Sequence, residues 1–176
     1  MVIDIVILAL LKRGPSHGYY IKKDIENILQ KRSRLNTNLL YPALHRLEKA
    51  EAIEKKSEAQ DGKPAKHIYR ITPGGKEYLH RLIEEFTDTD AAKEDEFLTR
   101  LAFFDLIDGT TRTKILRKRK SALETKLKFK TDVGSDYTAY LESPWVKAIM
   151  EFRDRQIYQE LEWIEKLLIM TSKKSS

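Results

Sequence analysis

One β-hairpin signal in an otherwise helical sequence limits the fold more than any other feature of the chain. Asp61-Gly62 is a dipeptide typical of a tight β-turn, and two short strand-like runs, Ile53 to Glu58 and Lys66 to Ile71, flank it. Thr72-Pro73 then begins another helix, with threonine as the N-cap and proline at the first helical position. The sequence therefore predicts a two-stranded wing that leads directly into a helix.

The apolar run from Met1 to Leu11, interrupted only by Asp4, predicts a buried helix that ends at Gly14-Pro15. A signal peptide or a membrane span is the alternative interpretation. A run of about ten residues is too short to cross a bilayer. Asp4 stands where a signal peptide would carry basic residues, and no small-residue cleavage site follows. We therefore expect a buried helix and no membrane segment.

Two more helices are predicted before the wing. Ser16 is the predicted N-cap of the second helix, which places Ile21, Ile25 and Ile28 on one face. A polar, basic stretch leads to a third helix over about 38–50. Three helices, a hairpin and a helix form a winged helix-turn-helix. We therefore predict a mostly α fold with a small β-wing.

The remainder of the chain is predicted to be helical after a short polar hinge. Long apolar stripes, such as Trp145, Ile149 and Phe152, exceed what a small first domain could cover, so a C-terminal helical dimerisation domain is expected. A self-contained helical hairpin in a monomer is the alternative. The predicted boundaries are a first domain over 1–86, a hinge over 87–93, a helical domain over 94–172 and a disordered tail over 173–176.

The net charge of +6 is concentrated in the first half of the 176 residues. Residues 1–85 hold 16 Lys/Arg and 11 Asp/Glu, a balance of +5, whereas residues 86–176 hold 17 and 16, a balance of +1. The chain has no cysteine, which excludes disulfides, thiolate metal sites and cysteine nucleophiles and fits a reducing cytoplasm. The predicted winged domain is therefore the basic one.

The third predicted helix has one polar face without an acidic residue. At about 100° per residue, its leucines gather on one side, while Asn38, Tyr41, Pro42, His45 and Lys49 fall on the other, flanked by Arg46 and Glu48. Amide, phenol, imidazole and ammonium groups reach base edges and phosphates in a major groove. An ordinary solvated helix face is the alternative interpretation.

These motifs resemble the PadR family of bacterial transcriptional regulators. The resemblance is carried by Leu39 to Glu48 in the third helix, His17 to Ile21 in the second, and Tyr69 to Gly75 at the exit from the wing. Asp95 to Phe97 and Trp163 to Leu168 are similar to the longer-tailed branch, which includes the phenolic-acid-responsive regulators. The resemblance spans the whole chain.

One position departs from the family pattern. The family usually has glycine at the end of the third helix, where this chain has Glu51. Glycine suits the left-handed conformation found just past a helix, and another residue costs about 1 kcal/mol there. Either this helix ends differently or the strain at Glu51 is tolerated.

The resemblance implies a homodimeric repressor whose third helices enter successive major grooves of double-stranded DNA at an inverted-repeat operator. The wing is then expected to approach the flanking backbone or minor groove. The residues predicted to contact DNA are Thr37, Asn38, Tyr41, Pro42, His45, Arg46, Lys49, Lys63 and Lys66.

The same resemblance implies a small-molecule effector, an aromatic acid or another hydrophobic compound, near the junction of the two domains. The aromatic residues expected to line such a site are Tyr19, Tyr20, Phe97, Trp145 and Trp163. The alternative is that each of them is an ordinary core residue.

No catalytic or metal-binding pattern is present in the sequence. The four histidines form no closely spaced ligand pair, and Gly74-Gly75-Lys76 lacks the upstream glycine of a phosphate-binding loop. We therefore expect a cytoplasmic regulator that is not an enzyme and has no cofactor or bound metal. The rival hypothesis is a helical adaptor that binds protein partners and has a basic N-terminal half.

Overall fold

The computed structural model describes residues 2–28, 39–60, 63–128 and 142–173. It has two compact units, one made of residues 1–86 and 98–107 and the other of residues 87–97 and 108–176. Helices dominate both, and the first unit also contains a small antiparallel sheet. This confirms the predicted fold class, a mostly α chain with a winged helix-turn-helix.

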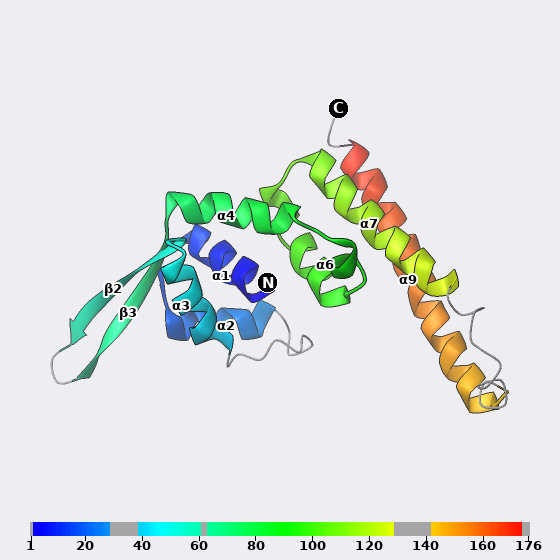
Figure 1. Cartoon of the computed structure of the whole chain (residues 1–176), viewed down its shortest axis with the longest axis horizontal. Helices are drawn as coiled ribbons and strands as arrows, with labels where there is room; N and C mark the ends of the chain where they lie inside the picture. Colours follow the sequence, from blue (N-terminus) through cyan, green and yellow to red (C-terminus); the bar gives the residue numbers. More distant parts are fainter. Residues whose placement is uncertain (1, 29–38, 61–62, 129–141, 174–176) are drawn as a thin grey trace. The chain divides into compact units, whose positions relative to one another are not determined.

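The apolar helix α1 (Val2–Arg13) forms the centre of the first unit (Figure 1). All its residues from Val2 to Leu11 are buried, because α2 (Gly18–Ile28), α3 (Leu40–Lys49), α4 (Pro73–Glu84) and the sheet pack around it. This confirms the buried helix that the apolar run predicts. In the part of the chain that the structure describes, no helix is both long and apolar enough to cross a membrane.

The predicted N-cap at Ser16 is wrong. Ser16 and His17 form a short strand, β1 (Ser16–His17), that pairs antiparallel with β3 (Lys63–Ile71), with Ser16 opposite Tyr69 and His17 opposite Ile68. Helix α2 begins only at Gly18. The backbone of Ser16 and His17 is thus paired with a strand about fifty residues away, a partner that no local pattern shows.

The wing consists of β2 (Ile53–Gln60) and β3, which projects from the first unit in Figure 1. The sheet order is β1-β3-β2, and Gln60 lies opposite Lys63, so the connection is the dipeptide 61–62, which lies outside the described residues. Both strands are longer than the predicted 53–58 and 66–71, and the pairing is irregular between Glu58 and Gln60.

Helix α4 begins as predicted. Thr72 is its N-cap and accepts a hydrogen bond from the backbone N–H of Gly75 at 2.9 Å, and Pro73 occupies the first helical position. Leu79, Leu82 and Ile83 of α4 are buried, and so is Phe86 just after its end.

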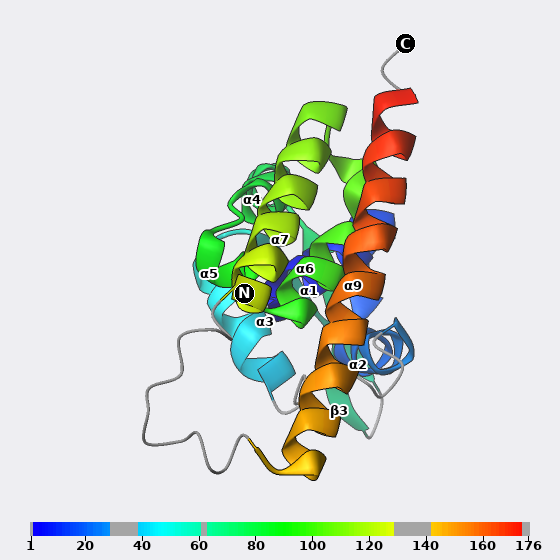
Figure 2. The same cartoon turned by 90° about the vertical axis from the view of Figure 1, so that its right-hand side faces the viewer.

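The second unit is built on two long helices, α7 (Gly109–Lys128) and α9 (Pro144–Lys173), which pack side by side (Figure 2). The short α5 (Asp88–Ala91) packs on α7, and the division between the units passes through α6 (Glu94–Leu101), which a 3₁₀ turn (Phe104–Leu106) follows. Residues 87–93, predicted as a hinge, contain α5 and its capping box between Thr87 and Asp90. The predicted functional boundaries stay a prediction, and residues 174–176 of the predicted tail lie outside the described residues.

Candidate nucleic-acid interface

Helix α3 separates an apolar face from a polar one, as its sequence predicts. Leu40, Leu44 and Leu47 are buried, whereas the other face presents Tyr41, Pro42, His45, Arg46 and Lys49 to solvent. Pro42 is the third helical residue, and because the first N–H groups of a helix have no intrahelical partner, it removes no hydrogen bond there. Thr37 and Asn38, also predicted to contact DNA, lie outside the described residues.

Arg46 has a second role that the sequence did not reveal. Its Nη2 donates to Oδ1 of Asp4 on α1 at 2.6 Å. The Asp4 side chain is only 6% exposed, and a carboxylate buried in an apolar helix is costly without such a partner. Arg46 therefore fixes α3 on α1 while its side chain as a whole remains 57% exposed. The only sign of this pair in the sequence is Asp4 itself, a single acidic residue in an apolar run.

The C-terminal end of α3 is a tight left-handed turn. The backbone N–H of Glu51 donates to Glu48 O and that of Ala52 donates to Leu47 O, both at 2.9 Å, which are the two bonds of a Schellman motif. Glu51 adopts φ 55°, the only positive φ of a non-glycine residue in the described ranges. Of the two alternatives, the structure shows the second: the helix ends in the usual turn and Glu51 carries the strain.

The end of α3 is also joined to the start of α4. The Thr72 hydroxyl lies 2.7 Å from Glu51 O and 3.2 Å from Ala52 O, and the Thr72 N–H donates to Ala52 O at 3.1 Å. A Cβ on Gly75 would lie 1.9 Å from Ala52 O. Thr72 and Gly75 thus hold the first turn of α4 directly against the turn that ends α3. This close contact explains why the Tyr69 to Gly75 motif has threonine and glycine at these two positions.

A hollow of about 290 Å³ lies beside the polar face of α3. Its lining comes from β1, α2, α3 and β3, and we call it the tyrosine hollow: His17, Gly18, Tyr19, Tyr20, Tyr41, His67 and Tyr69. The rings of Tyr19 and Tyr20 meet edge to face, with centroids 5.5 Å apart. The sequence did not predict this grouping, because its members lie on four separate elements.

Hydrogen bonds and burial define the floor of the tyrosine hollow. His17 Nδ1 lies 3.2 Å from His67 O, and His67 Nδ1 lies 3.1 Å from Ser57 Oγ, so polar contacts link all three strands. Burial raises the pKa of Tyr69, and the Glu48 carboxylate and Tyr41 raise it further. The Tyr69 phenol therefore stays neutral at physiological pH.

The wing lysines are placed only by their backbone. Lys63 is the first residue of β3, and Lys66 lies opposite Glu58 in the strand pairing. Their side chains lie outside what the structure describes. Their predicted contact with DNA stays a prediction.

The predicted effector residues are not all brought together. Phe97 is fully buried, and the Trp163 ring meets it edge to face with centroids 6.2 Å apart. Trp145 is 79% exposed and lies 18 residues before Trp163 on α9, which is about 27 Å along a helix. Tyr19 and Tyr20 belong to the tyrosine hollow of the first unit. Within the second unit, only Phe97 and Trp163 form a common cluster.

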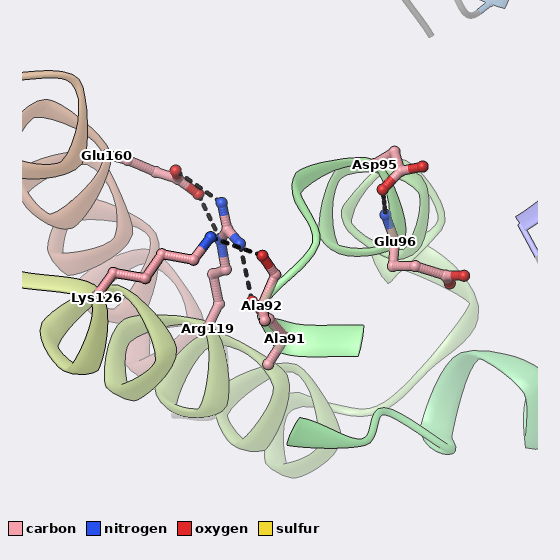
Figure 3. Close-up of polar contacts among 7 residues, drawn as sticks. All are labelled: Ala91, Ala92, Asp95, Glu96, Arg119, Lys126 and Glu160. Atoms are coloured by element: carbon pink, nitrogen blue, oxygen red, sulfur yellow. Dashed lines mark hydrogen bonds and ion pairs between the residues drawn. The ribbon is translucent and has the colours of Figure 1, made fainter. Parts of the chain in front are cut away.

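A buried arginine that sequence reasoning missed, Arg119, lies against Phe97 of this cluster. Figure 3 shows its polar contacts. Arg119 on α7 donates from Nε and Nη2 to the two carboxylate oxygens of Glu160 on α9, at 2.7 and 2.9 Å, and from Nη1 to Ala91 O at 2.8 Å. Its guanidinium lies 5.5 Å from the centroid of the Phe97 ring. Because Glu160 is 41 residues away in the sequence, no local pattern shows the pair.

Potential metal ligands do not gather in the part of the chain that the structure describes: no three His, Asp or Glu side chains lie close enough together to hold an ion.

Comparisons with known proteins point to one family. The pattern of the transcriptional regulator PadR-like family matches residues 7–81. An uncharacterized protein X of Lysinibacillus sphaericus is 36% identical over 87 residues, which cover 49% of this chain and 79% of that protein. The negative transcriptional regulator PadR of Bacillus subtilis strain 168 is 23% identical over 142 residues, which cover 81% of this chain and 76% of that protein.

Two solved structures of B. subtilis PadR are also similar. The complex with operator DNA has a TM-score of 0.46 and 21% identity, and the match covers 97% of this chain and 99% of that one. The complex with p-coumaric acid has a TM-score of 0.44 and 20% identity, and covers 98% and 99%. The family match itself, residues 7–81, includes α2, α3, the sheet and most of α4.

Proposed function

The chain belongs to the PadR-like family of transcriptional regulators, which is not a family of enzymes, and we propose that it acts as a homodimeric repressor in the cytoplasm. In this proposal each winged helix-turn-helix contacts one half of an inverted-repeat operator, and a small effector releases the protein from DNA. The rival role, a helical adaptor, has no specific feature of the described residues in its favour.

The outward face of α3 carries the proposal. Tyr41, His45 and Lys49 are exposed on it and supply a phenol, an imidazole and an ammonium group, which bind base edges and phosphates. The helix that bears them is fixed on α1 by the Arg46–Asp4 pair and at its end by the junction with Thr72. Rigid placement matters because base contacts need the side chains at set positions along the groove.

The exposed face of α9 supports the homodimer. Trp145, Ile149 and Phe152 recur at helical spacing and are 79%, 55% and 61% exposed. The second apolar set of α9, Ile157 to Leu168, is buried or half-buried on the side that meets α7. A monomeric helical hairpin would leave the aromatic stripe in water, whereas a second copy of the chain would cover it.

A dimer of this kind sets the form of the operator. Two-fold symmetry requires an inverted repeat, and helices that enter successive major grooves read half-sites about 10 base pairs, or about 34 Å, apart. The wing, with Lys63 and Lys66, is proposed to follow the flanking minor groove or backbone.

Selection of binding sites from random duplexes, followed by fluorescence anisotropy at two salt concentrations, tests the function. We expect an inverted repeat to emerge and to bind at least about 10³-fold more tightly than an unrelated duplex. If every duplex binds more weakly than about 10⁻⁴ to 10⁻⁶ M, the range of non-specific binding, the regulator proposal fails and the adaptor replaces it.

The role of the wing has its own test. Lys63→Ala should weaken binding to all duplexes and reduce the slope of log K against log salt by about 1, because one phosphate contact is lost. Lys76→Ala on the exposed surface of α4 is the control and should leave the slope unchanged. An unchanged slope for Lys63→Ala would remove the wing from the interface.

The effector is proposed to bind beside Trp163, the partly exposed member of its cluster with Phe97. p-Coumaric acid is the first probe. In a Trp145→Phe variant, whose remaining tryptophan is Trp163, we expect its addition to change the fluorescence and to lower the affinity for the selected operator. If a series of phenolic acids changes neither quantity, this class of effector is excluded.

A further inference from the structure

The tyrosine hollow lies between the two parts of the first unit that are proposed to enter DNA grooves. Tyr41 belongs to the outward face of α3, whereas His67 and Tyr69 belong to β3, the strand that begins in the wing. With α3 in a major groove and the wing along the flanking minor groove, the sugar–phosphate backbone that separates these grooves must pass between them. The hollow occupies that position.

Exposed apolar side chains of the first unit gather around the same place. Among its described residues, five large apolar side chains are exposed: Tyr19, Tyr20, Leu39, Tyr41 and Leu98. Three of them line the hollow, and Leu39 comes immediately before α3. Exposed aromatic groups that cluster in this way mark a contact surface more often than an ordinary solvated one.

The chemistry of the lining suits a sugar–phosphate segment. It contains phenols and imidazoles but no lysine, arginine, aspartate or glutamate. A phenol O–H donates to a phosphate oxygen, and the ring beside it offers an apolar face to a deoxyribose. Uncharged donors of this kind position a backbone without reading its sequence.

We propose that the tyrosine hollow receives the sugar–phosphate backbone of the operator and that the hydroxyls of Tyr19 and Tyr20 donate hydrogen bonds to its phosphate oxygens. The proposal rests on the proposed function. It gives Tyr19 and Tyr20 a contact with DNA in place of the effector contact predicted from the sequence. The contacts of His17 with His67, and of His67 with Ser57, hold this surface at the base of the wing.

The test removes the hydroxyls and keeps the rings. Tyr19→Phe, Tyr20→Phe and the double variant are compared by anisotropy on the selected operator and on an unrelated duplex. We expect each hydroxyl to contribute about three- to tenfold in affinity, with an equal loss on both duplexes. The salt slope should stay unchanged, because a neutral donor releases no counterion. Tyr158→Phe on the exposed surface of α9 is the control and should bind like the wild type.

A second measurement locates the contact on the DNA. Methylphosphonate groups, which carry no charge, replace single phosphates of the operator in turn. At the contacted phosphate, the loss caused by the double Tyr→Phe variant should largely disappear, because the hydrogen bond is already weakened.

Three results would overturn the proposal while the proposed function stands. They are wild-type affinity of the double variant on both duplexes, a loss confined to the selected operator, and a loss that no methylphosphonate position reduces. Failure of the wild-type protein itself to bind any duplex would instead overturn the proposed function, and this inference with it.

Discussion

Glu51 is a single residue whose conformation works against the stability of the fold. Its φ of 55° lies in the left-handed region, and its carboxylate adds negative charge at the negative end of the α3 dipole. Glu51→Gly should raise the free energy of unfolding by about 1 kcal/mol, measured by urea unfolding followed by circular dichroism. Glu51→Gln keeps the Cβ and removes only the charge, so it should gain less than half as much. Equal gains from both variants would show that backbone strain is not the cause.

Among Gly14, Gly18, Gly74 and Gly75, Gly75 is the glycine with the least room for a Cβ. A Cβ there would lie 1.9 Å from Ala52 O and 2.8 Å from Ala52 C, which are backbone atoms that cannot rotate away. Gly75→Ala should therefore push α4 off the end of α3 and lower the free energy of unfolding by about 2 kcal/mol or more. Gly74→Ala is the matched control, because its Cβ would meet only Thr72 Oγ1, at 3.9 Å. Similar unfolding midpoints for the two variants would contradict this account of the junction.

Among the elements of the second unit, Arg119 ties three helices together. The Arg119 side chain is 3% exposed and that of Glu160 is 20% exposed, so removing one partner leaves a largely buried charge. Arg119→Met should cost about 3–5 kcal/mol, and Arg119→Met with Glu160→Leu should recover most of it. Thermal unfolding followed by tryptophan fluorescence measures both, with Arg117→Met on the exposed side of α7 as the control. If the double variant is as unstable as the single one, burial of charge is not the source of the loss.

The elements follow from the sequence where their causes are local. The apolar run of α1, the Thr72-Pro73 start of α4 and the turn signal of the hairpin between Ile53 and Ile71 all depend on residues within a few positions of one another. Strand β1 does not, because it exists only through pairing with β3. Helix α5 was not predicted although its cause is local, because its capping box has Asp90 where the usual box has glutamate or glutamine.

The candidate site also has one part that local sequence predicts and other parts that depend on contacts between distant elements. The outward face of α3 could be predicted, because a helical period fixes which side chains share a face. The Arg46–Asp4 pair and the tyrosine hollow could not, since each joins residues from elements that only the folded chain brings together. The effector residues stay a prediction. They were grouped by residue type alone, and the structure places Trp145 about 27 Å along α9 from Trp163.

At the scale of the whole molecule, most of the net charge and the exposed apolar stripe of α9 lie on different units. The first half of the chain holds most of the net charge of +6 and the polar face of α3. The second unit holds the exposed stripe of Trp145, Ile149 and Phe152. This separation suits a protein that binds DNA with one unit and a second copy of itself with the other, because a dimer doubles the positive charge presented to the DNA.

If the protein binds DNA as a dimer, substitutions that dissociate the dimer should also lower its affinity for the operator. Trp145→Glu combined with Phe152→Glu places two charges in the proposed interface and should convert the protein to a monomer in sedimentation equilibrium. Tyr158→Glu is the control, because Tyr158 is 60% exposed on another side of α9 and should leave the dimer intact. The monomer should still bind a single half-site weakly, but should lose about 10²-fold or more in affinity for the full operator, since the second half-site no longer binds at the effective concentration that the dimer provides. Loss of DNA affinity while the protein stays a dimer would contradict this prediction. So would dissociation to a monomer that keeps the wild-type affinity for the full operator.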